Sequence, residues 1–206
     1  MDKSLKEHSA LLIIDVQQDF CGPTGLMAHY NADLSMIDGA VDRIELLTDH
    51  AHAQRIPVIY VSLVTRPQTD SRAMKAWYAR QGMDGEQAVA LCRDGSPGAE
   101  WYRVKPAAED YIVEKQRYSA FVATNLELLL QQLQIKRLIV TGVTTECCVD
   151  STVRDGFMKD YEMFVVEDAC AAYELEMHAM SIKIIGLNFA TIMSTEQVLT
   201  SWNGVE

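Results

Sequence analysis

Three polar residues with complementary chemistry each lie at the end of a strongly apolar segment of this sequence: Asp15, Lys115 and Cys148. A cysteine attacks as its thiolate and can carry a covalent intermediate. A carboxylate beside it can take the thiol proton and later give it to a leaving amine, provided that burial and neighbouring charges tune its pKa. A lysine can hold that carboxylate in place and stabilise the thiolate. Together the three residues predict a two-step acyl transfer through a thioester.

The stretch 138–152 is central to this hypothesis. It begins as an apolar, β-branched run, turns at Gly142 and continues as a helix start that contains Cys147 and Cys148. A thiol there lies at the positive end of the helix dipole, which favours the thiolate. The free N–H groups of the turn at 144–148 are suited to binding a tetrahedral oxyanion. Each residue taken singly also has a structural explanation: a loop anchor for Asp15, a solvated side chain for Lys115 and a small core residue for the cysteine.

The elements that would position these residues alternate between strands and helices. Strands are predicted at 9–16, 58–63, 110–114, 137–143, 162–167 and 190–193. Helices are predicted at 33–55, 121–133, 146–159, 174–187 and 196–202. This alternation predicts an α/β fold with three α-β-α layers and a doubly wound, mostly parallel sheet of about six strands. Because the carboxyl ends of parallel strands face one crevice, the three polar residues can converge there.

The length, net charge and composition of the chain limit the class of protein to which it can belong. A length of 206 residues fits one domain over 1–206, with an irregular insertion at about 65–105 that we expect to form a pocket wall or a subunit interface. The net charge of -11 argues against nucleic-acid binding and, more weakly, against anionic membrane surfaces. The apolar runs are too short for a transmembrane helix, and the polar N-terminus does not read as a signal peptide. We therefore expect a cytoplasmic protein with five reduced cysteines. The five histidines show no zinc-site spacing.

Three ordered motifs carry a resemblance to a known family. They read Leu-Leu-Ile-Ile-Asp-Val-Gln-Gln-Asp-Phe at 11–20, Glu-Lys-Gln-Arg-Tyr-Ser-Ala-Phe at 114–121, and Gly-Val-Thr-Thr-Glu-Cys-Cys-Val-Asp-Ser-Thr at 142–152. In this order they resemble the signatures of the isochorismatase-like cysteine hydrolases, over essentially the whole chain. The resemblance implies the Rossmann-like topology of that family and a catalytic triad of Asp15, Lys115 and Cys148. It also implies a homo-oligomer, a tetramer or a dimer.

The resemblance distinguishes between the two thiols of the third motif. In the family the nucleophile falls three residues after the threonine matched by Thr145 and is followed by valine, which selects Cys148 and leaves Cys147 to pack against the sheet. The family pattern further implies a non-proline cis peptide between Val143 and Thr144. The N–H groups of Thr144 and Cys148 would then form the oxyanion hole.

Departures from the family pattern narrow the activity. Isochorismatases proper lack the nucleophilic cysteine, and nicotinamidases carry an Asp-x-His metal motif after the second strand, where this chain reads Ser-Leu-Val-Thr-Arg-Pro at 62–67 and has no histidine. We therefore expect a metal-independent hydrolase without a cofactor that cleaves a C–N bond of a small amide or ureido compound of the biuret, triuret, ureidoacrylate or N-carbamoyl type. The glycine-rich loop at 92–100 is similar to that of ureido and biuret-type members. A nicotinamidase or maleamate-type amidase and a non-catalytic binding protein of the same fold remain the alternatives.

Substrate contacts are predicted from position in the sequence and, for Asn188, from the resemblance to biuret-type members of the family, which place a polar substrate contact there. Residues just beyond the catalytic strand ends, in the insertion, or 40 residues after Cys148 are the candidates: Gln17, Phe20, Arg66, Trp77, Tyr118 and Asn188. Loop packing, helix capping and contacts between subunits are the structural explanations for the same residues.

Overall fold

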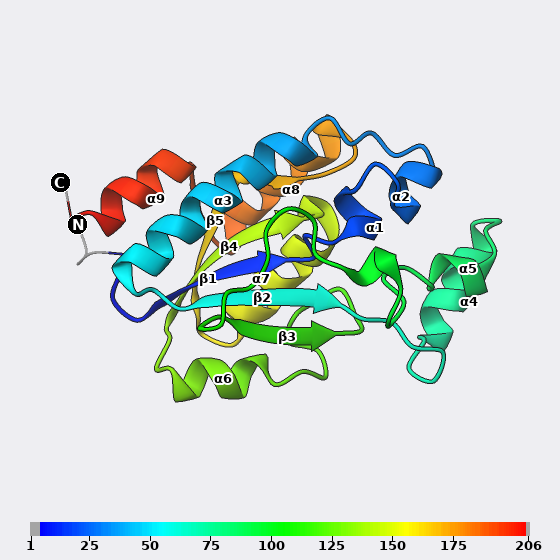
Figure 1. Ribbon diagram of the computed structural model, residues 1–206, viewed down its shortest axis with the longest axis horizontal. Helices are drawn as coiled ribbons and strands as arrows, with labels where there is room; N and C mark the ends of the chain where they lie inside the picture. The colour runs from blue at the N-terminus through cyan, green and yellow to red at the C-terminus, as the bar shows by residue number, and fades with distance from the viewer. Residues whose placement is uncertain (1–4, 205–206) are drawn as a thin grey trace.

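The computed structural model describes residues 5–204, and six parallel strands form its central sheet (Figure 1). The strand order is β3-β2-β1-β4-β5-β6. The bounds are β1 Ser9–Ile14, β2 Val58–Leu63, β3 Tyr111–Lys115, β4 Arg137–Val143, β5 Glu162–Ala171 and β6 Thr191–Met193. From β1 the chain proceeds to one edge through β2 and β3 and then returns to pair β4 with β1. The order therefore reverses between β1 and β4, and such a switch point is where open α/β sheets bind ligands.

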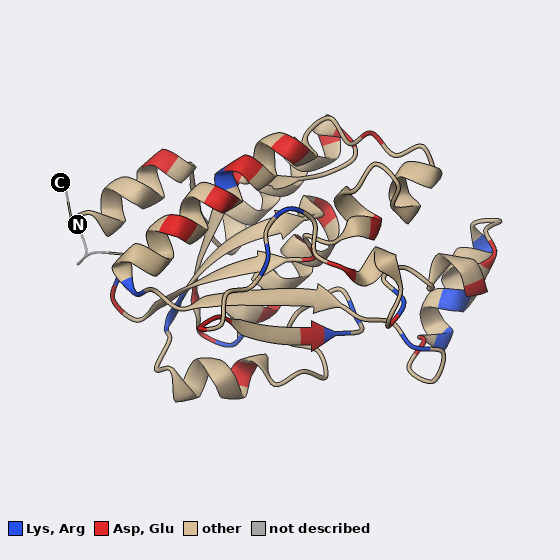
Figure 2. Ribbon diagram, in the orientation of Figure 1, with Lys and Arg blue, Asp and Glu red and all other residues tan. Residues whose placement is uncertain are grey.

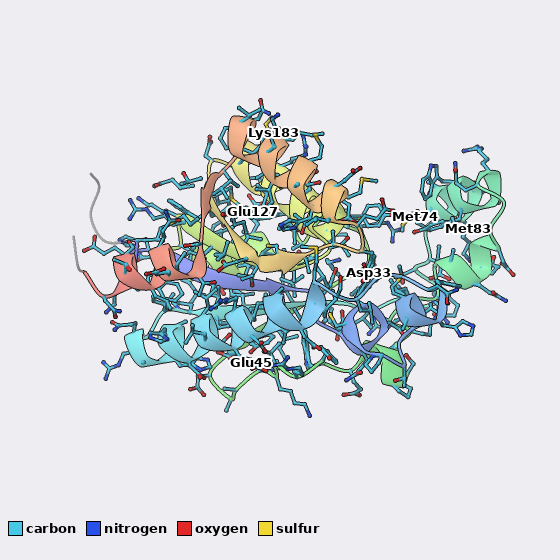
Figure 3. The ribbon with its side chains drawn as sticks, turned by 90° about the horizontal axis from the view of Figure 1, so that it is seen from above. Asp33, Glu45, Met74, Met83, Glu127 and Lys183 are labelled. Carbon is cyan, nitrogen blue, oxygen red and sulfur yellow. The ribbon has the colours of Figure 1, made fainter. Side chains whose placement is uncertain are left out.

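Helices cover both faces of this sheet, as the sequence predicted. On one face lie α3 (Ile37–Gln54) and α9 (Thr195–Trp202); on the other lie α6 (Leu126–Gln132), α7 (Asp150–Met158) and α8 (Leu175–Asn188). Figure 2 shows that acidic residues recur along the length of α3. Figure 3, turned by 90°, places α3 and α8 on opposite sides of the strands.

The apolar character of β1 follows from these two layers. Every residue of β1 is buried. Leu11 and Ile13 pack in the core beneath α3, whereas Leu12 and Ile14 pack in the core beneath α6 and α7. A strand buried on both faces reads as a continuous apolar run because successive side chains point to opposite faces.

The structure differs from the sequence prediction mainly at element ends. The helix expected from residue 121 begins at Leu126, because residues 120–124 form a turn in which the Thr124 hydroxyl donates to the Ala120 carbonyl. Strand β5 continues to Ala171, past its predicted end, with an irregular register opposite Val140–Gly142 of β4.

The insertion contains helices that the sequence prediction missed. They are α4 (Arg72–Arg80), capped by Ser71, and α5 (Gly85–Ala88), capped by Asp84. A 3-10 turn follows at Pro97–Ala99, and two further short helices, α1 (Gln18–Cys21) and α2 (Leu26–His29), follow β1. In Figure 1, α4 and α5 project beyond the carboxyl ends of the strands. Within residues 5–204, no helix is both long and apolar enough to cross a membrane.

Gly142, near the end of β4, allows a close approach between strands that no other residue would tolerate. Its φ is 117°, and a Cβ there would collide with the carbonyl oxygen of Ile14 in β1. We expect Gly142→Ala to lower the free energy of unfolding by about 3 kcal/mol, since it combines backbone strain with overpacking. Denaturant unfolding measures this change.

Gly39 in α3 provides the matched control for Gly142→Ala. A Cβ at Gly39 has no atom within 4 Å. Gly39→Ala should therefore leave stability unchanged or raise it by about 0.5–1 kcal/mol through helix propensity. Equal destabilisation by both substitutions would contradict the role given to Gly142.

Candidate active site

The structure brings Asp15, Lys115 and Cys148 together at the carboxyl end of the sheet. Asp15 follows β1, Lys115 is the last residue of β3, and Cys148 lies in the turn after β4. The Lys115 Nζ is 2.7 Å from Asp15 Oδ2 and donates to Cys148 Sγ at 3.3 Å. A third hydrogen bond of 3.1 Å joins Nζ to the carbonyl of Arg117. All three catalytic candidates are buried, so these contacts are made away from bulk water.

The backbone at Asp15 has an unusual conformation. Its φ of 54° lies in the left-handed region, which aspartate tolerates better than most residues. The Asp15 N–H donates to the carbonyl of Val61 in β2, and its own carbonyl accepts from the N–H of Gln17. The sheet therefore ends at this residue with its backbone groups paired and its carboxylate held beside Lys115.

Burial and charge set the protonation of the cluster. Burial raises the pKa of Asp15, and the charge of Lys115 and the contact with Cys148 oppose that rise. Burial acts to lower the pKa of Lys115, but its interactions with Asp15 and Cys148 outweigh that effect and raise the pKa. The hydrogen bond with Cys147, together with burial and the Asp15 charge, raises the pKa of the Cys148 thiol well above its usual value.

The raised pKa of Cys148 differs from the expectation that the helix dipole favours a thiolate. The resting state that follows is a neutral Cys148 thiol beside an ion pair of Asp15 and Lys115. A nucleophile in that state needs an adjacent base at the moment of attack. Asp15, which contacts both Lys115 and Cys148, is the candidate for that base.

We call residues 144–149, which contain the candidate nucleophile Cys148, the nucleophile turn; it joins β4 to α7 and is held by several hydrogen bonds. The Val143–Thr144 peptide is cis, and residues Thr145–Val149 form a π-helical turn. The N–H groups of Cys147 and Val149 both donate to the Thr144 carbonyl. Helix α8 supports the turn from outside, because Thr145 Oγ1 and His178 Nδ1 are 2.8 Å apart. Burial lowers the pKa of His178, against the opposing charge of Glu167, which favours a neutral ring.

A cavity of about 260 Å³ opens beside the Cys148 thiol. Thr144, Cys147 and Cys148 line its base. Cys147 is half-buried, so its side chain contacts both the cavity and the hydrophobic core. The insertion contributes much of the opposite wall: Thr69, Asp70, Ser71, Met74, Tyr78, Ala88, Val89 and Leu91.

Two of the six predicted substrate contacts line this cavity. Phe20 does so from α1, and Tyr118 does so from the loop after β3, with its hydroxyl 3.4 Å from that of Tyr78. Burial and the Tyr78 contact raise the pKa of Tyr118, so its hydroxyl stays protonated and can donate.

The structure does not place Gln17 or Arg66 on the cavity wall. The buried Gln17 amide donates to the carbonyls of Leu63 and Ala99 and accepts from the Leu63 N–H, so it ties loops together. The Arg66 guanidinium forms ion pairs with Asp94 at 2.7 Å and Glu114 at 3.1 Å. Both side chains were predicted to contact substrate, but their polar groups are instead bonded to other residues of the protein.

Trp77 and Asn188 also lie outside the cavity. Trp77 faces a separate surface depression that it shares with Ala73, Met74 and Tyr118. Asn188 ends α8, and its amide donates to the carbonyl of Ile184. It borders a groove at the amino ends of β5 and β6. The catalytic candidates lie at the other end of the strands, the carboxyl end. The predicted contact fails because α8 runs back along the strands, away from Cys148.

Three charged cavity residues were missed by the sequence analysis: Asp70, which is paired with Lys75 and Arg93, and also Glu146 and Arg117. Glu146, within the nucleophile turn, lines the cavity, and its Oε2 is buried without a hydrogen-bond partner. Arg117 lines it two residues after Lys115; its Nη1 donates to the carbonyls of Thr69 and Gln116, and no carboxylate among residues 5–204 pairs with it. Glu146 and Arg117 are each two residues from a catalytic candidate in sequence, and this closeness could have identified them as cavity residues.

Known proteins match this chain along nearly its whole length. The family model for the isochorismatase domain matches residues 9–197. Ureidoacrylate amidohydrolase RutB of Acinetobacter baylyi is 28% identical over 209 residues, which cover 95% of this chain and 84% of that protein. Enterobactin synthase component B of Escherichia coli is also 28% identical, but this chain spans only 63% of its length.

Solved structures show the same architecture. A cysteine hydrolase from Pseudomonas syringae superposes with a TM-score of 0.82 at 25% identity, covering 97% of this chain and 94% of that one. N-carbamoylsarcosine amidase from Thermoplasma acidophilum gives a TM-score of 0.71 at 25% identity, covering 91% and 96%.

Proposed function

Because this chain belongs to the isochorismatase family and is a hydrolase, we propose that it is a cysteine amidohydrolase that cleaves a C–N bond of a small ureido or amide compound. The observation that carries this proposal is the buried cluster of Asp15, Lys115 and Cys148, in which the Cys148 residue also lines a cavity. Cysteine hydrolases and amidohydrolases among its relatives support it.

In the first half of the reaction, the Cys148 sulfur attacks the substrate carbonyl carbon while Asp15 accepts the thiol proton. The positive charge of Lys115 stabilises the sulfur as it becomes anionic. N–H groups of the nucleophile turn, at Thr144 and Cys148, bind the oxyanion. The tetrahedral intermediate then collapses: the C–N bond breaks, the nitrogen takes the proton from Asp15, and ammonia or a small amine leaves.

In the second half, water hydrolyses the thioester. Asp15, again a carboxylate, takes a proton from the water as its oxygen attacks the carbonyl carbon. The C–S bond breaks and the proton returns to the Cys148 sulfur. The product is a carboxylic or carbamic acid, and the enzyme regains its neutral thiol.

The charged residues of the cavity favour a ureido acid as substrate. An unpartnered buried carboxylate oxygen, such as Oε2 of Glu146, requires a hydrogen-bond donor, and ureido N–H groups supply two or three. The guanidinium of Arg117 is suited to a carboxylate. A volume of about 260 Å³ admits only a small molecule. Ureidoacrylate and N-carbamoyl amino acids combine both groups, whereas biuret and triuret lack the carboxylate.

Substitution of Arg117 and Glu146 tests this assignment. We expect Arg117→Met to raise KM for a ureido acid about 10- to 100-fold, because it removes a charge-assisted hydrogen bond, and to leave KM for biuret almost unchanged. Glu146→Gln should raise KM for both, since both present ureido N–H groups. Steady-state ammonia release measures these values. Equal effects of Arg117→Met on both substrates would refute the carboxylate contact.

A substrate panel tests the activity itself. Ammonia release should occur with at least one of ureidoacrylate, N-carbamoyl amino acids, biuret and triuret, and mass spectrometry should detect an acyl adduct on Cys148. Activity confined to nicotinamide or maleamate would favour those amidases. A non-catalytic binding protein would release no ammonia from any of them, and a chloroacetamide reagent would label its thiols slowly and without preference for Cys148.

A further inference from the structure

Much of the wall of the cavity beside Cys148 is apolar and is not used by the contacts proposed for Glu146 and Arg117. Ureidoacrylate and N-carbamoylglycine are short and polar along nearly their whole length, so neither presents an apolar group to such a wall. A pocket that combines a few polar groups with apolar side chains favours a ligand of the same composition. The apolar wall consists of Phe20, Met27, Leu63, Met74, Val89 and Leu91.

Two hydroxyl groups among the residues that line this cavity are already bonded to the protein. The Thr65 hydroxyl donates to the carbonyl of Leu91 at 2.8 Å. The Tyr173 hydroxyl donates to the carbonyl of Phe20 at 3.0 Å. Neither hydroxyl therefore has a hydrogen left to donate to a ligand.

The charge of Asp70, which also lines the cavity, is balanced by two neighbouring cations. Its carboxylate accepts hydrogen bonds of 2.8 and 3.2 Å from the guanidinium of Arg93, and the Nζ of Lys75 lies 3.4 Å away. The Asp70 side chain is only 3% exposed. Asp70 is therefore not available to a positively charged group of a substrate.

We propose that the apolar wall binds an alkyl side chain, and that the substrate is an N-carbamoyl amino acid that carries one. This inference rests on the proposed function and narrows its substrate class. In such a molecule the ureido group and the carboxylate are both attached to the α-carbon. When Glu146 binds the ureido group and Arg117 binds the carboxylate, the side chain is the remaining substituent that can reach the apolar wall.

Met74 of α4 is the residue of this wall that we expect to influence specificity most. It lines both the catalytic cavity and the surface depression that contains Trp77, so it separates the two. A methionine side chain is apolar and flexible, and it adapts to partners of different shape. Met74 can therefore adjust to alkyl groups of different length.

A homologous series of substrates tests the proposal. The series consists of the N-carbamoyl derivatives of glycine, alanine, 2-aminobutyrate, norvaline and norleucine, with each enantiomer assayed separately for ammonia release. We expect kcat/KM to rise about 3- to 4-fold with each added methylene until the wall is filled. If kcat/KM is constant or falls along the series while the glycine derivative or ureidoacrylate is cleaved, the apolar side-chain site is wrong and the proposed function stands.

A matched pair of substrates separates polarity from size. N-carbamoylserine differs from the 2-aminobutyrate derivative by a hydroxyl in place of a methyl group. Its kcat/KM should be about 10-fold lower, because the hydroxyl would be buried without a hydrogen-bond partner. Equal values for the two compounds would overturn the proposal.

Two methionine variants connect this preference to the wall. Met74→Gln keeps the length of the side chain but adds a polar amide, so the ratio of kcat/KM for the norvaline derivative to that for the glycine derivative should fall about 5- to 20-fold. The control is Met83→Gln, in the turn between α4 and α5, where the methionine is 46% exposed and does not line the cavity (Figure 3). It should leave the ratio unchanged.

The ratio of the two kcat/KM values does not depend on how much of each variant is folded, so a structural defect alone does not alter it. An unchanged ratio in Met74→Gln, or an equal fall in both variants, would overturn the role given to Met74 and its wall. Absence of ammonia from every ureido compound would overturn the proposed function and this inference together.

Discussion

Cys148→Ala is expected to abolish ammonia release, with a loss of about 10⁴-fold or more in kcat, because no other group can form the thioester. Cys147→Ala should keep most of the activity. The geometry supports this difference: Lys115 donates to Cys148 Sγ at 3.3 Å, whereas Cys147 is half-buried between the core and the cavity. Steady-state ammonia release with the best substrate of the panel measures both variants.

The labelling rate of Cys148 gives an independent readout. The hydrogen bond with Cys147 is the leading cause of the raised pKa of Cys148. Cys147→Ala removes it, so the pKa of Cys148 should fall and its alkylation at neutral pH should become faster. Equal loss of activity in the two variants, or slower alkylation after Cys147→Ala, would refute the roles given to these thiols.

Asp15→Asn should have the second largest effect, and on two quantities at once. Activity should fall about 10²- to 10⁴-fold, because amide nitrogen and oxygen cannot accept and return the thiol proton. The free energy of unfolding should fall by about 3–5 kcal/mol, because the buried Lys115 loses the carboxylate 2.7 Å away. Ammonia release and denaturant unfolding measure the two effects.

The double variant Asp15→Asn/Lys115→Met separates catalysis from stability. Methionine removes the unpaired charge and nearly fills the space of lysine, so the double variant should recover much of the lost stability. Its activity should remain lost. If the double variant is no more stable than Asp15→Asn, then the unpaired ammonium of Lys115 is not the source of the destabilisation.

The fold class and the meeting of the catalytic residues were predictable because both follow from strand topology. A strand such as β1, buried on both faces, leaves an unmistakable apolar run, and parallel strands bring their carboxyl ends to one edge. The polar residue that ends each run, such as Asp15, must therefore reach that edge. That these residues meet can be predicted without knowing which side chains contact each other.

The cavity wall could not be predicted in the same way, because it depends on contacts between distant segments. Gln17 was predicted to face substrate, yet its amide is used by Leu63 and Ala99, 46 and 82 residues away in sequence. Helices α4 and α5 begin at local caps, Ser71 and Asp84, but their placement over the cavity depends on distant contacts such as the hydrogen bond from Arg117 to the Thr69 carbonyl. Asn188 was misplaced because the direction of α8 was not taken into account.

The catalytic candidates and much of the cavity wall belong to different segments of the chain, and this affects how mutation can alter substrate preference. The proposed catalytic residues lie just after β1, at the end of β3 and in the turn after β4, whereas residues 69–91 supply much of the facing wall. Mutation or exchange of that segment can alter which molecule fits while the bond-breaking groups keep their support from the sheet. The insertion is therefore where we would randomise residues to obtain new substrate preferences.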